Sequence, residues 1–293
     1  MSDAVAEFEE RRRRLLSRQR LQALVGTALF SLLLAYAFHR SAFFDSHIGG
    51  DPLGRIADFL QRMNPDLRAE ALFEDKETQG SLAYWFYGLP RWLKLAWQTF
   101  EMAVLATVLG AAAGLLASFL CARNLMPIAA VRFAVRRTLE AIRTFPDLIL
   151  ALILVAAFGV GPLAGVLTLA ISTMGSLGRL FAEINEEVDP RPLEGLRASG
   201  ASLPRMIRYG VIPQALPSYA SYLLIRLEGN LAGAAALGIV GAGGIGLELQ
   251  HAIHYVEFDT YLAILSIIIG MIFALDLISE AIRHRLIGLA RPK

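Results

Sequence analysis

The feature that most constrains this chain is an uncharged stretch of 31 residues, 148–178. With a rise of about 1.5 Å per residue, one helix of this length would extend well beyond the ~30 Å hydrocarbon core of a bilayer. Gly159, Gly161 and Pro162 interrupt the stretch and favour a turn. We therefore expect two membrane-spanning helices joined by a tight external turn. A hydrophobic content of 55% and a mean hydropathy of +0.50 agree, because both are too high for an ordinary soluble domain.

Four further apolar runs have lengths near that of a membrane span. They lie at residues 21–38, 95–120, 215–237 and 260–282. Together with the first stretch they predict an all-α, polytopic membrane bundle with about six transmembrane helices. The predicted parts are a tail at 1–20, an anchor at 21–38, an external loop at 39–94, a transmembrane domain at 95–288 and a tail at 289–293.

The basic residues predict the orientation of these spans. Arginines at positions 11–14 precede the first span, and Arg283 and Arg285 follow the last, so both termini are expected on the cytoplasmic side. A cleavable signal peptide is the alternative for residues 21–38, because Ala35 and Ala37 form an A-x-A pattern. The long basic leader favours a retained anchor.

Aromatic and small residues predict how the spans meet the bilayer and each other. Four aromatic residues gather where the external loop meets the second span, as in an interfacial belt: Trp85, Tyr87, Trp92 and Trp97. Glycines four residues apart, Gly110 with Gly114 and Gly229 with Gly233, favour close approach of helix backbones.

Residues 127–144 combine charged and apolar residues at helical spacing. Four charged residues share one helical face: Arg132, Arg136, Glu140 and Arg143. Such a helix can lie at the membrane surface or begin a span inside a bundle. Pro146 should kink or restart it.

The longest polar interruption of the apolar part of the chain covers residues 189–217. Pro190 and Pro192 open it, and Gly200 allows a turn after a first short helix. Ser202 offers an N-cap for a second helical piece that has Pro204 in its first turn. Arginines surround both pieces, so the segment is expected to contact a partner in the cytoplasm.

The predicted fifth span contains Arg226, Glu228 and Asn230. Charges at membrane depth are costly and usually face a cavity or a partner. Arg226 and Glu228 are two residues apart and point in different directions on a helix, so each needs a partner on another helix. A functional pathway and a structural network between helices are both open interpretations.

Residues 237–246 contain five glycines and do not favour a continuous helix. Since glycine permits unusual turns and close packing, we expect an irregular external or re-entrant gate there, with Gly241, Gly243, Gly244 and Gly246 as its residues.

Several enzyme classes find no support in the sequence. The nucleotide-binding pattern G-x-x-x-x-G-K-[ST] does not occur. Cys121 is the single cysteine, and His251 and His254 have no evident third metal ligand, so we expect no metal site. The serines have no histidine and aspartate arranged to activate them, so we expect no catalytic residue, cofactor or nucleic-acid partner.

The segment from Glu194 resembles the cytoplasmic motif of binding-protein-dependent ABC transporter permeases, written EAA, three residues, G, nine residues, I, one residue, LP. Glu194 begins the EAA position, Gly200 takes the glycine, Gly210 takes the isoleucine, and Ile212 and Pro213 take the LP. The spacing is kept, while several small or apolar positions differ. The amino-acid sequences of residues 143–148, 208–217 and 237–246 resemble those of the phosphonate-uptake branch of these permeases.

This resemblance implies a type I importer fold and the permease subunit of an ATP-driven importer in the bacterial inner membrane, surrounded by lipid. The implied partners are ABC ATPase subunits, which bind ATP and Mg²⁺, a periplasmic solute-binding protein, and a second copy of this chain. The external loop and the gate are then periplasmic. The implied substrate is phosphonate or a related small oxyanion. Another solute, such as phosphite or a methionine-like amino acid, is an alternative, and an intramembrane enzyme is a more distant one.

The resemblance also assigns residues to roles. We call residues 189–213 the coupling segment, because the motif implies contact with the ATPase through Glu194, Arg197, Gly200, Ala201, Ile212 and Pro213. An anion path would involve Arg226, with Glu228, Asn230 and Asp147 adjusting its electrostatic field.

Overall fold

The computed structural model describes residues 2–41 and 52–290 and divides the chain into two compact units, residues 1–60 and 61–293. The first unit contains α1 (Ser2–Arg40) and most of α2 (Pro52–Met63). The apolar part of α1 coincides with the predicted anchor and is exposed along its described side chains. The final three residues of the predicted C-terminal tail, like residues 42–51 of the predicted loop, lie outside the described residues.

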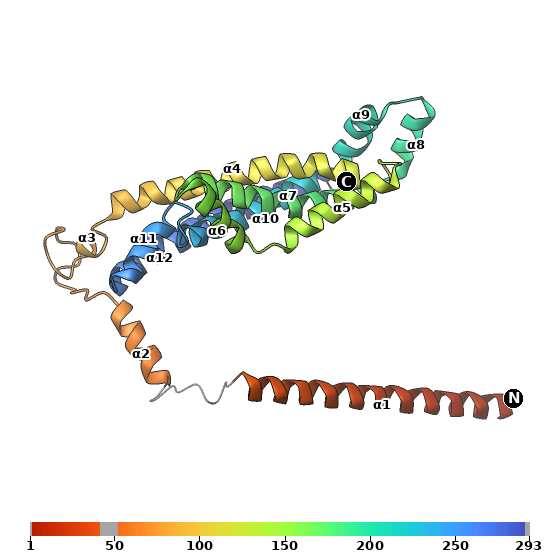
Figure 1. Ribbon diagram of the computed structural model, residues 1–293, viewed down its shortest axis with the longest axis horizontal. Helices are drawn as coiled ribbons and strands as arrows, with labels where there is room; N and C mark the ends of the chain where they lie inside the picture. Colours follow the sequence, from red (N-terminus) through yellow and green to blue (C-terminus); the bar gives the residue numbers. More distant parts are fainter. Residues whose placement is uncertain (1, 42–51, 291–293) are drawn as a thin grey trace. The chain divides into compact units, whose positions relative to one another are not determined.

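The second unit is a helical bundle, and the described residues contain no strand. Its helices are α3 (Leu82–Trp85), α4 (Leu89–Cys121), α5 (Ala129–Thr144), α6 (Asp147–Phe158), α7 (Pro162–Glu187), α8 (Pro190–Ala198), α9 (Leu203–Met206), the π-helical turn η1 (Ile207–Val211), α10 (Ile212–Gly238), α11 (Gly246–His254) and α12 (Phe258–Ala290). In Figure 1, α8 and α9 project from one end of this bundle, while α3 and α11 lie at the other.

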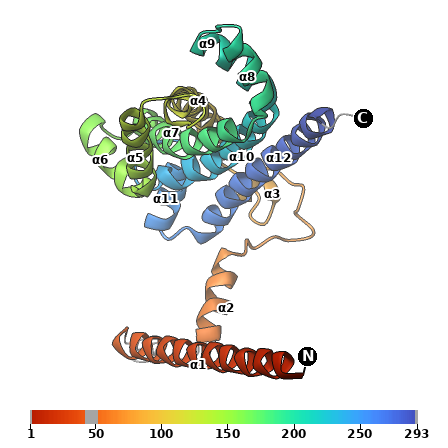
Figure 2. The same ribbon diagram turned by 90° about the vertical axis from the view of Figure 1, so that its right-hand side faces the viewer.

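The central helix of the bundle is α7, which contacts α4, α5, α6 and α10 (Figure 2). Its closest partner is α4, and small residues make that approach possible. A Cβ added to Gly114 of α4 would lie 2.9 Å from the backbone nitrogen of Gly178 on α7. The predicted role of Gly110 and Gly114 is thus confirmed. The second predicted pair behaves differently, because a Cβ on Gly229 would meet nothing within 4 Å.

Within the described ranges 2–41 and 52–290, four helices are long and apolar enough to cross a membrane: Arg11–Arg40, Leu89–Cys121, Pro162–Glu187 and Phe258–Arg285. A fifth span results if α5 and α6, bent by 87° at the break between them, are taken together. The sequence led us to expect about six. The difference comes from α10, which has 27 residues but carries Arg226, Glu228 and Asn230 and is not among the apolar helices.

The predicted turn at residues 159–161 is confirmed, but the helix before it is not a full span. α6 has 12 residues, which corresponds to about 18 Å of helix, well short of a bilayer core. Its apolar run continues backward only through the bend at Pro146 into charged α5. The 31-residue stretch therefore contains one long helix and one half-length helix.

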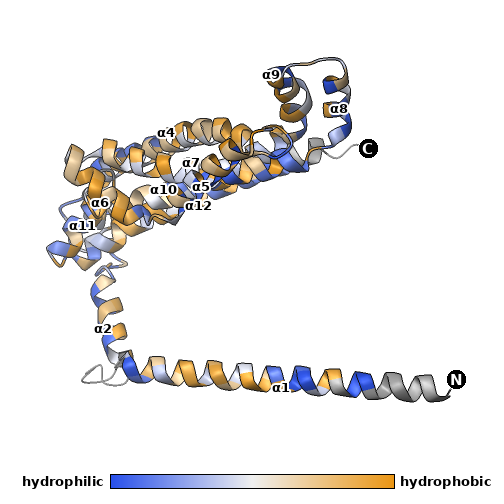
Figure 3. Cartoon of the chain, turned by 45° about the vertical axis from the view of Figure 1, so that its right-hand side comes forward, coloured by the Kyte–Doolittle hydropathy of each residue, from blue (hydrophilic) through white to orange (hydrophobic). Residues whose placement is uncertain are grey.

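Apolar residues fill the bundle interior and also cover much of its outside. Figure 3 shows α4 and α6 covered by hydrophobic residues, whereas α8 carries hydrophilic ones. Exposed large apolar side chains include Leu105 and Leu116 on α4, Leu152 on α6 and Phe273 on α12, as expected of surfaces that face lipid. Trp92 does not belong to the predicted interfacial belt, because it is 2% exposed and packs in a core with Ile245 and Ile264.

Candidate functional site

Local signals in the sequence determine where α8 begins. The carboxylate of Asp189 caps the helix by accepting a hydrogen bond from the backbone N–H of Arg191 at 3.0 Å. Pro190 and Pro192 follow in the first turn, where backbone N–H groups have no partner within the helix. The predicted first short helix of the coupling segment is thereby confirmed.

The end of α8 depends on Gly200. This residue has a φ of +76°, in the left-handed region that favours glycine. The N–H of Ala201 donates to Leu196 O at 3.0 Å, and the N–H of Gly200 donates to Arg197 O at 3.1 Å. These two bonds close the helix and reverse the chain. The chain then enters α9, with Ser202 at the N-cap position, although its hydroxyl makes no capping hydrogen bond.

α8 packs back against η1 through its leucines. A Cβ on Gly210 would lie 3.2 Å from Leu196 Cδ1 and 3.3 Å from Leu193 Cγ, so the two leucines occupy the space beside this glycine. Leu196 and Gly210 are two of the positions where the chain departs from the permease motif, which has alanine in place of Leu196 and isoleucine in place of Gly210. The two departures compensate in volume, because a larger residue on α8 faces a smaller one on η1.

The predicted coupling residues lie mainly on the surface at this end of the bundle. Exposed are Glu194, Arg197, Gly200 and Pro213, and half-buried are Ala201 and Ile212. Arg197 also reaches the connection between α4 and α5, where its Nη2 donates to the backbone oxygen of Asn124 at 3.3 Å. The set therefore forms one surface rather than an enclosed site.

A groove of about 760 Å³ lies beside α8. Its apolar lining comes from Leu125, Leu193, Leu203 and Met206, and its charged lining comes from Arg123, Glu186, Glu194 and Arg197. The Oδ1 atom of Asn124, which also lines the groove, is buried and accepts no hydrogen bond among the described residues. The groove thus combines an apolar floor with charged groups and one free acceptor.

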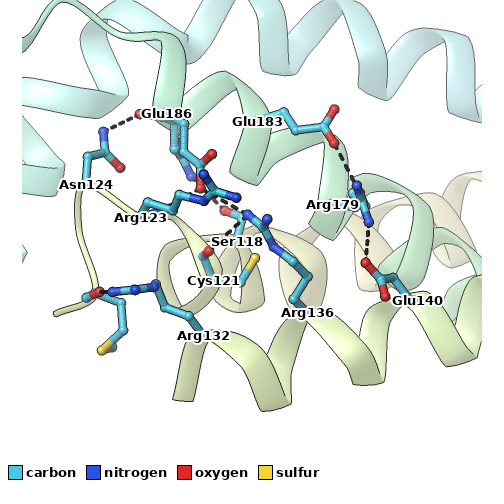
Figure 4. Close-up of polar contacts among 12 residues, drawn as sticks. Ser118, Cys121, Arg123, Asn124, Arg132, Arg136, Glu140, Arg179, Glu183 and Glu186 are labelled. Atoms are coloured by element: carbon cyan, nitrogen blue, oxygen red, sulfur yellow. Dashed lines mark hydrogen bonds and ion pairs between the residues drawn. The ribbon is translucent and has the colours of Figure 1, made fainter. Parts of the chain in front are cut away.

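Below α8, a polar network joins the ends of α4, α5 and α7 (Figure 4). Its central residues are Asn185 and Glu186, which sequence reasoning did not single out. A signal was present, because Gly178, Phe181, Ala182 and Asn185 recur at helical spacing and all are buried. An amide on an otherwise apolar helix face requires hydrogen-bond partners from neighbouring helices.

The predicted path residues separate into two groups. Arg226 Nε donates to Thr173 Oγ1 at 3.1 Å, and its Nη2 donates to Ser172 Oγ at 2.8 Å. Asn230 Nδ2 donates to the same Thr173 oxygen and to Thr107 Oγ1, both at 2.8 Å. Arg226 and Asn230 are thus joined through α7, while Asp147 is half-buried at the first position of α6.

Glu228 lies elsewhere, on the side of α10 that faces α12. Its Oε1 is 3.6 Å from Nη2 of Arg283. Three buried atoms in this region, Glu228 Oε1, Arg283 Nε and Ser279 Oγ, have no hydrogen-bond partner among the described residues. The expectation that Arg226 and Glu228 find partners on different helices is confirmed.

The glycine-rich segment between α10 and α11 is buried from Gly241 to Gly246 and folds against the opposite end of the bundle. Gly241, Gly243 and Gly244 have φ values of +93°, +89° and +74°. Gly161 N–H donates to Gly241 O at 3.0 Å, which ties the segment to the turn before α7. The predicted irregular backbone is confirmed, and it is closely packed.

Two further contacts fix this segment. Ile245 N–H donates to Thr99 Oγ1 of α4 at 2.9 Å. A Cβ on Gly246 would overlap the carbonyl oxygen of Ala235 and lie 2.7 Å from the Cα of Gly238. Only hydrogen atoms fit at this crossing of α10 and α11.

Comparison with known proteins agrees with the motif. The family model described as "Binding-protein-dependent transport system inner membrane component" matches residues 110–288. The phosphite transport system permease protein PtxC of Stutzerimonas stutzeri is 36% identical over 198 residues, covering 68% of this chain and 72% of that protein. The phosphate-import permease protein PhnE of Mycolicibacterium smegmatis is 39% identical over 67% of this chain, which spans only 37% of that longer protein.

A third relative, the putative cryptic phosphonate transport system permease protein PhnE2 of Escherichia coli, is 42% identical over 41% of this chain and 99% of its own length. Solved structures share the fold at low identity. An inward-facing MetNI methionine ABC transporter matches with 21% identity and a TM-score of 0.58, covering 66% of this chain and 95% of that chain. A bacterial alginate importer matches with 14% identity and a TM-score of 0.60, covering 87% and 95%.

Family match, relatives and fold lead to one assignment. The matched region contains the coupling segment, the paired polar residues of α7 and α10 and the glycine-rich segment. ATP hydrolysis in such systems lies in a separate subunit. The chain belongs to the family of binding-protein-dependent transport system inner membrane components, the multi-pass permease subunits of ABC importers.

Proposed function

We propose that this permease forms the membrane path for phosphonate or a related small oxyanion. The observation that carries the proposal is the state of Arg226. Its guanidinium is held by two hydroxyl groups, and it makes no ion pair with any residue in the described part of the chain. A cation at membrane depth without a paired carboxylate favours an anion nearby. Three relatives are named for phosphite, phosphate and phosphonate transport, which supports this substrate class.

The hydrogen bonds of Arg226 leave donors free for such an anion. A guanidinium has five N–H groups, and the two bonds to Ser172 and Thr173 use Nε and one hydrogen on Nη2. The remaining donors suit the oxygens of a tetrahedral anion. We assign Asp147 to the same path. Asn230 would position Thr173, and Glu228 would belong to the interhelical pair with Arg283.

The test of this path is uptake by the complete transporter, reconstituted with its ATPase and binding protein. Arg226→Ala should reduce oxyanion uptake while the ATPase remains assembled, because the cation is removed and the hydroxyls stay. Arg226→Lys is the matched control for charge, and should retain more uptake than Arg226→Ala. Equal uptake by wild type and Arg226→Ala would remove this residue from the path. A binding protein that selects an amino acid would contradict the oxyanion assignment.

At the other functional surface, α8 and its groove would dock on the ATPase, in an assembly with two copies of this chain. The exposed Glu194 and Arg197 would provide polar contacts, and the groove floor would receive an apolar group. We propose that the coupling segment and both termini lie on the cytoplasmic side, in agreement with the arginines before the first span and after the last. Residues 61–88 and α11 would then face the periplasm and the binding protein.

Gly200→Pro tests the coupling role, because proline cannot adopt the positive φ that ends α8. We expect membrane insertion to continue while ATP hydrolysis no longer drives uptake, and a milder form of the same defect in Glu194→Ala. Gly195→Ala is the control, since a Cβ there meets nothing within 4 Å. Normal uptake by Gly200→Pro at wild-type expression would refute the role.

For the glycine-rich segment we propose a periplasmic gate that moves together with the turn before α7. Its hydrogen bonds to Gly161 and Thr99 support movement as one unit, because separate motion of Gly241, Gly243, Gly244 or Gly246 would break close backbone contacts.

A further inference from the structure

Asn185 is a buried amide whose three hydrogen bonds lead to three different parts of the bundle. It is 0% exposed. Its Nδ2 donates to Ser118 Oγ of α4 at 3.0 Å, and its Oδ1 accepts a hydrogen bond from the hydroxyl of Tyr219 on α10. Its backbone oxygen accepts from Asn124 Nδ2 at 2.6 Å. Since a buried amide without partners is costly, this arrangement fixes the relative positions of α4, α7 and α10.

The next residue, Glu186, extends the connection to α5. Its Oε1 accepts from the backbone N–H of Arg123 at 2.8 Å and from Arg136 Nη2 at 3.0 Å. The two side chains of the Arg136–Glu186 ion pair are 29% and 25% exposed, so water screens the pair only in part. Two turns earlier on α7, Arg179 Nη1 donates to Glu140 Oε1 of α5 at 2.5 Å. α5 is therefore attached to α7 by two successive ion pairs of opposite polarity (Figure 4).

From this pair the connections continue into the coupling segment. α8 begins only four residues after Glu186. Asp189 N–H donates to Gln214 Oε1 at 3.0 Å, and Gln214 Nε2 donates to Gly210 O at 2.6 Å. Arg197 Nη2 donates to the backbone oxygen of Asn124, the residue whose side chain donates to the backbone oxygen of Asn185. Each end of α8 is thus bonded to the elements that Asn185 and Glu186 hold.

We propose that Asn185 and Glu186 are positioning residues for coupling. They hold the ends of α4, α5, α7 and α10 as one body with α8, so that a force applied to α8 by the ATPase moves four helix ends together. The inference rests on the coupling role proposed above and adds the means of transmission. If α8 were a hinged arm, its displacement would leave these helix ends behind, and the polar bonds between them would serve no mechanical purpose.

The experiment uses the complete transporter in proteoliposomes, with its ATPase and binding protein, and measures the number of ATP molecules hydrolysed per oxyanion taken up. Glu186→Gln weakens the contacts to Arg123 and Arg136 at nearly constant volume. Tyr219→Phe removes only the hydroxyl bonded to Asn185 and leaves the ring packed on Phe181. We expect each variant to raise the ratio about fivefold or more, the scale of a typical coupling free energy.

Glu183→Gln is the matched control. Glu183 lies on the same helix and accepts a hydrogen bond from Arg179 at 3.1 Å, but it is more exposed and reaches neither α4 nor α10 among the described contacts. The control should leave the ratio unchanged. Arg136→Gln should reproduce the part of the Glu186→Gln effect that comes from their ion pair, and the double variant should be no worse than Glu186→Gln alone, because both substitutions remove that pair.

Melting temperatures distinguish coupling from stability. Tyr219→Phe takes from Asn185 Oδ1 its hydrogen-bond donor, so the proposal expects a raised ratio together with a fall in melting temperature of about 2–4 °C and with the folded fraction preserved. The proposal is overturned if hydrolysis and uptake fall in parallel with the melting temperature, or if the ratio stays at the wild-type value in both Glu186→Gln and Tyr219→Phe. Gly200→Pro run beside them separates the two proposals. If Gly200→Pro uncouples hydrolysis from uptake while Glu186→Gln and Tyr219→Phe do not, only the positioning role is overturned. Normal uptake by Gly200→Pro would refute the role of the coupling segment itself.

Discussion

Polar side chains make the contacts between helices at the end of the bundle that bears α8 and α9, whereas direct backbone contacts between glycines are added to them at the opposite end, near the Arg91–Glu248 ion pair. Near α8 the contacts are amides, carboxylates and guanidinium groups on Asn185, Glu186, Arg136 and Arg197. In the segment from Gly238 to Gly246, glycines bring α10, α11 and the turn before α7 so close that no side chain fits. The same helices, α7 and α10, pass from one kind of contact to the other along their length.

The two ends should differ in how they tolerate a substitution. At the α8 end, loss of one polar bond costs about 1 kcal/mol. Backbone in direct contact has no rotamer with which to adapt. Each end can move as a rigid unit, but the glycine end should be the more sensitive to an added methyl group.

The largest effect should come from Gly246→Ala. Its Cβ would overlap the carbonyl oxygen of Ala235, and neither helix can turn a side chain away to relieve the overlap. We expect a loss of at least about 3 kcal/mol in the free energy of unfolding, measured as a lower melting temperature and a smaller folded fraction after size-exclusion chromatography in detergent.

Gly270→Ala on α12 is the matched control for that substitution. A Cβ there meets nothing within 4 Å, so the change should be neutral or stabilise the helix by up to about 1 kcal/mol. Equal melting temperatures for both variants would show that the glycine end adapts as readily as the α8 end, and would end the contrast between them.

An intermediate effect is expected where α8 meets η1. Leu196→Ala should leave a gap beside Gly210, and Gly210→Ile should collide with Leu193 and Leu196, each at a cost of about 1–3 kcal/mol. In the double variant the added isoleucine fills the space that leucine vacates. We expect a coupling energy of about 1–2 kcal/mol in a double-mutant cycle from melting curves. Strictly additive losses would mean that the two motif departures do not compensate.

The smallest effect concerns the two helix starts in the coupling segment. Asp189→Ala removes a side-chain cap on α8 and should cost about 1 kcal/mol. Ser202→Ala removes a hydroxyl that makes no capping bond, and should change stability by less than about 0.5 kcal/mol. Amide hydrogen exchange in α8 and α9 measures both. A larger increase in the exchange rate of α9 in Ser202→Ala than of α8 in Asp189→Ala would reverse this ranking.

Features set by a few neighbouring residues were predictable from the sequence. The start of α8 follows from Asp189 and two prolines, and its end follows from Gly200. The contact between α4 and α7 was expected from Gly110 and Gly114, because glycine spacing reports directly on how near another backbone can come.

Features that depend on distant packing were not predictable in the same way. The break at Pro146 was expected and is confirmed by the 87° bend between α5 and α6, but hydropathy counts apolar length alone, so the half-length of α6 was not expected. Trp92 has the composition of an interfacial residue, and only the folding of α11 and α12 around it makes it part of the core. For the same reason the sequence presents Glu186 only as a charged residue in the last turn of a helix, and its role follows from the ion pair with Arg136 of α5.

The π-helical turn η1 links the coupling segment to α10 with one residue more than an α-helical turn would contain. If that residue were absorbed into regular α-helix, α9 would turn by about 100° and advance by about 1.5 Å relative to α10. The extra residue at η1 therefore sets the direction in which α9 leaves the axis of the helix that carries Arg226.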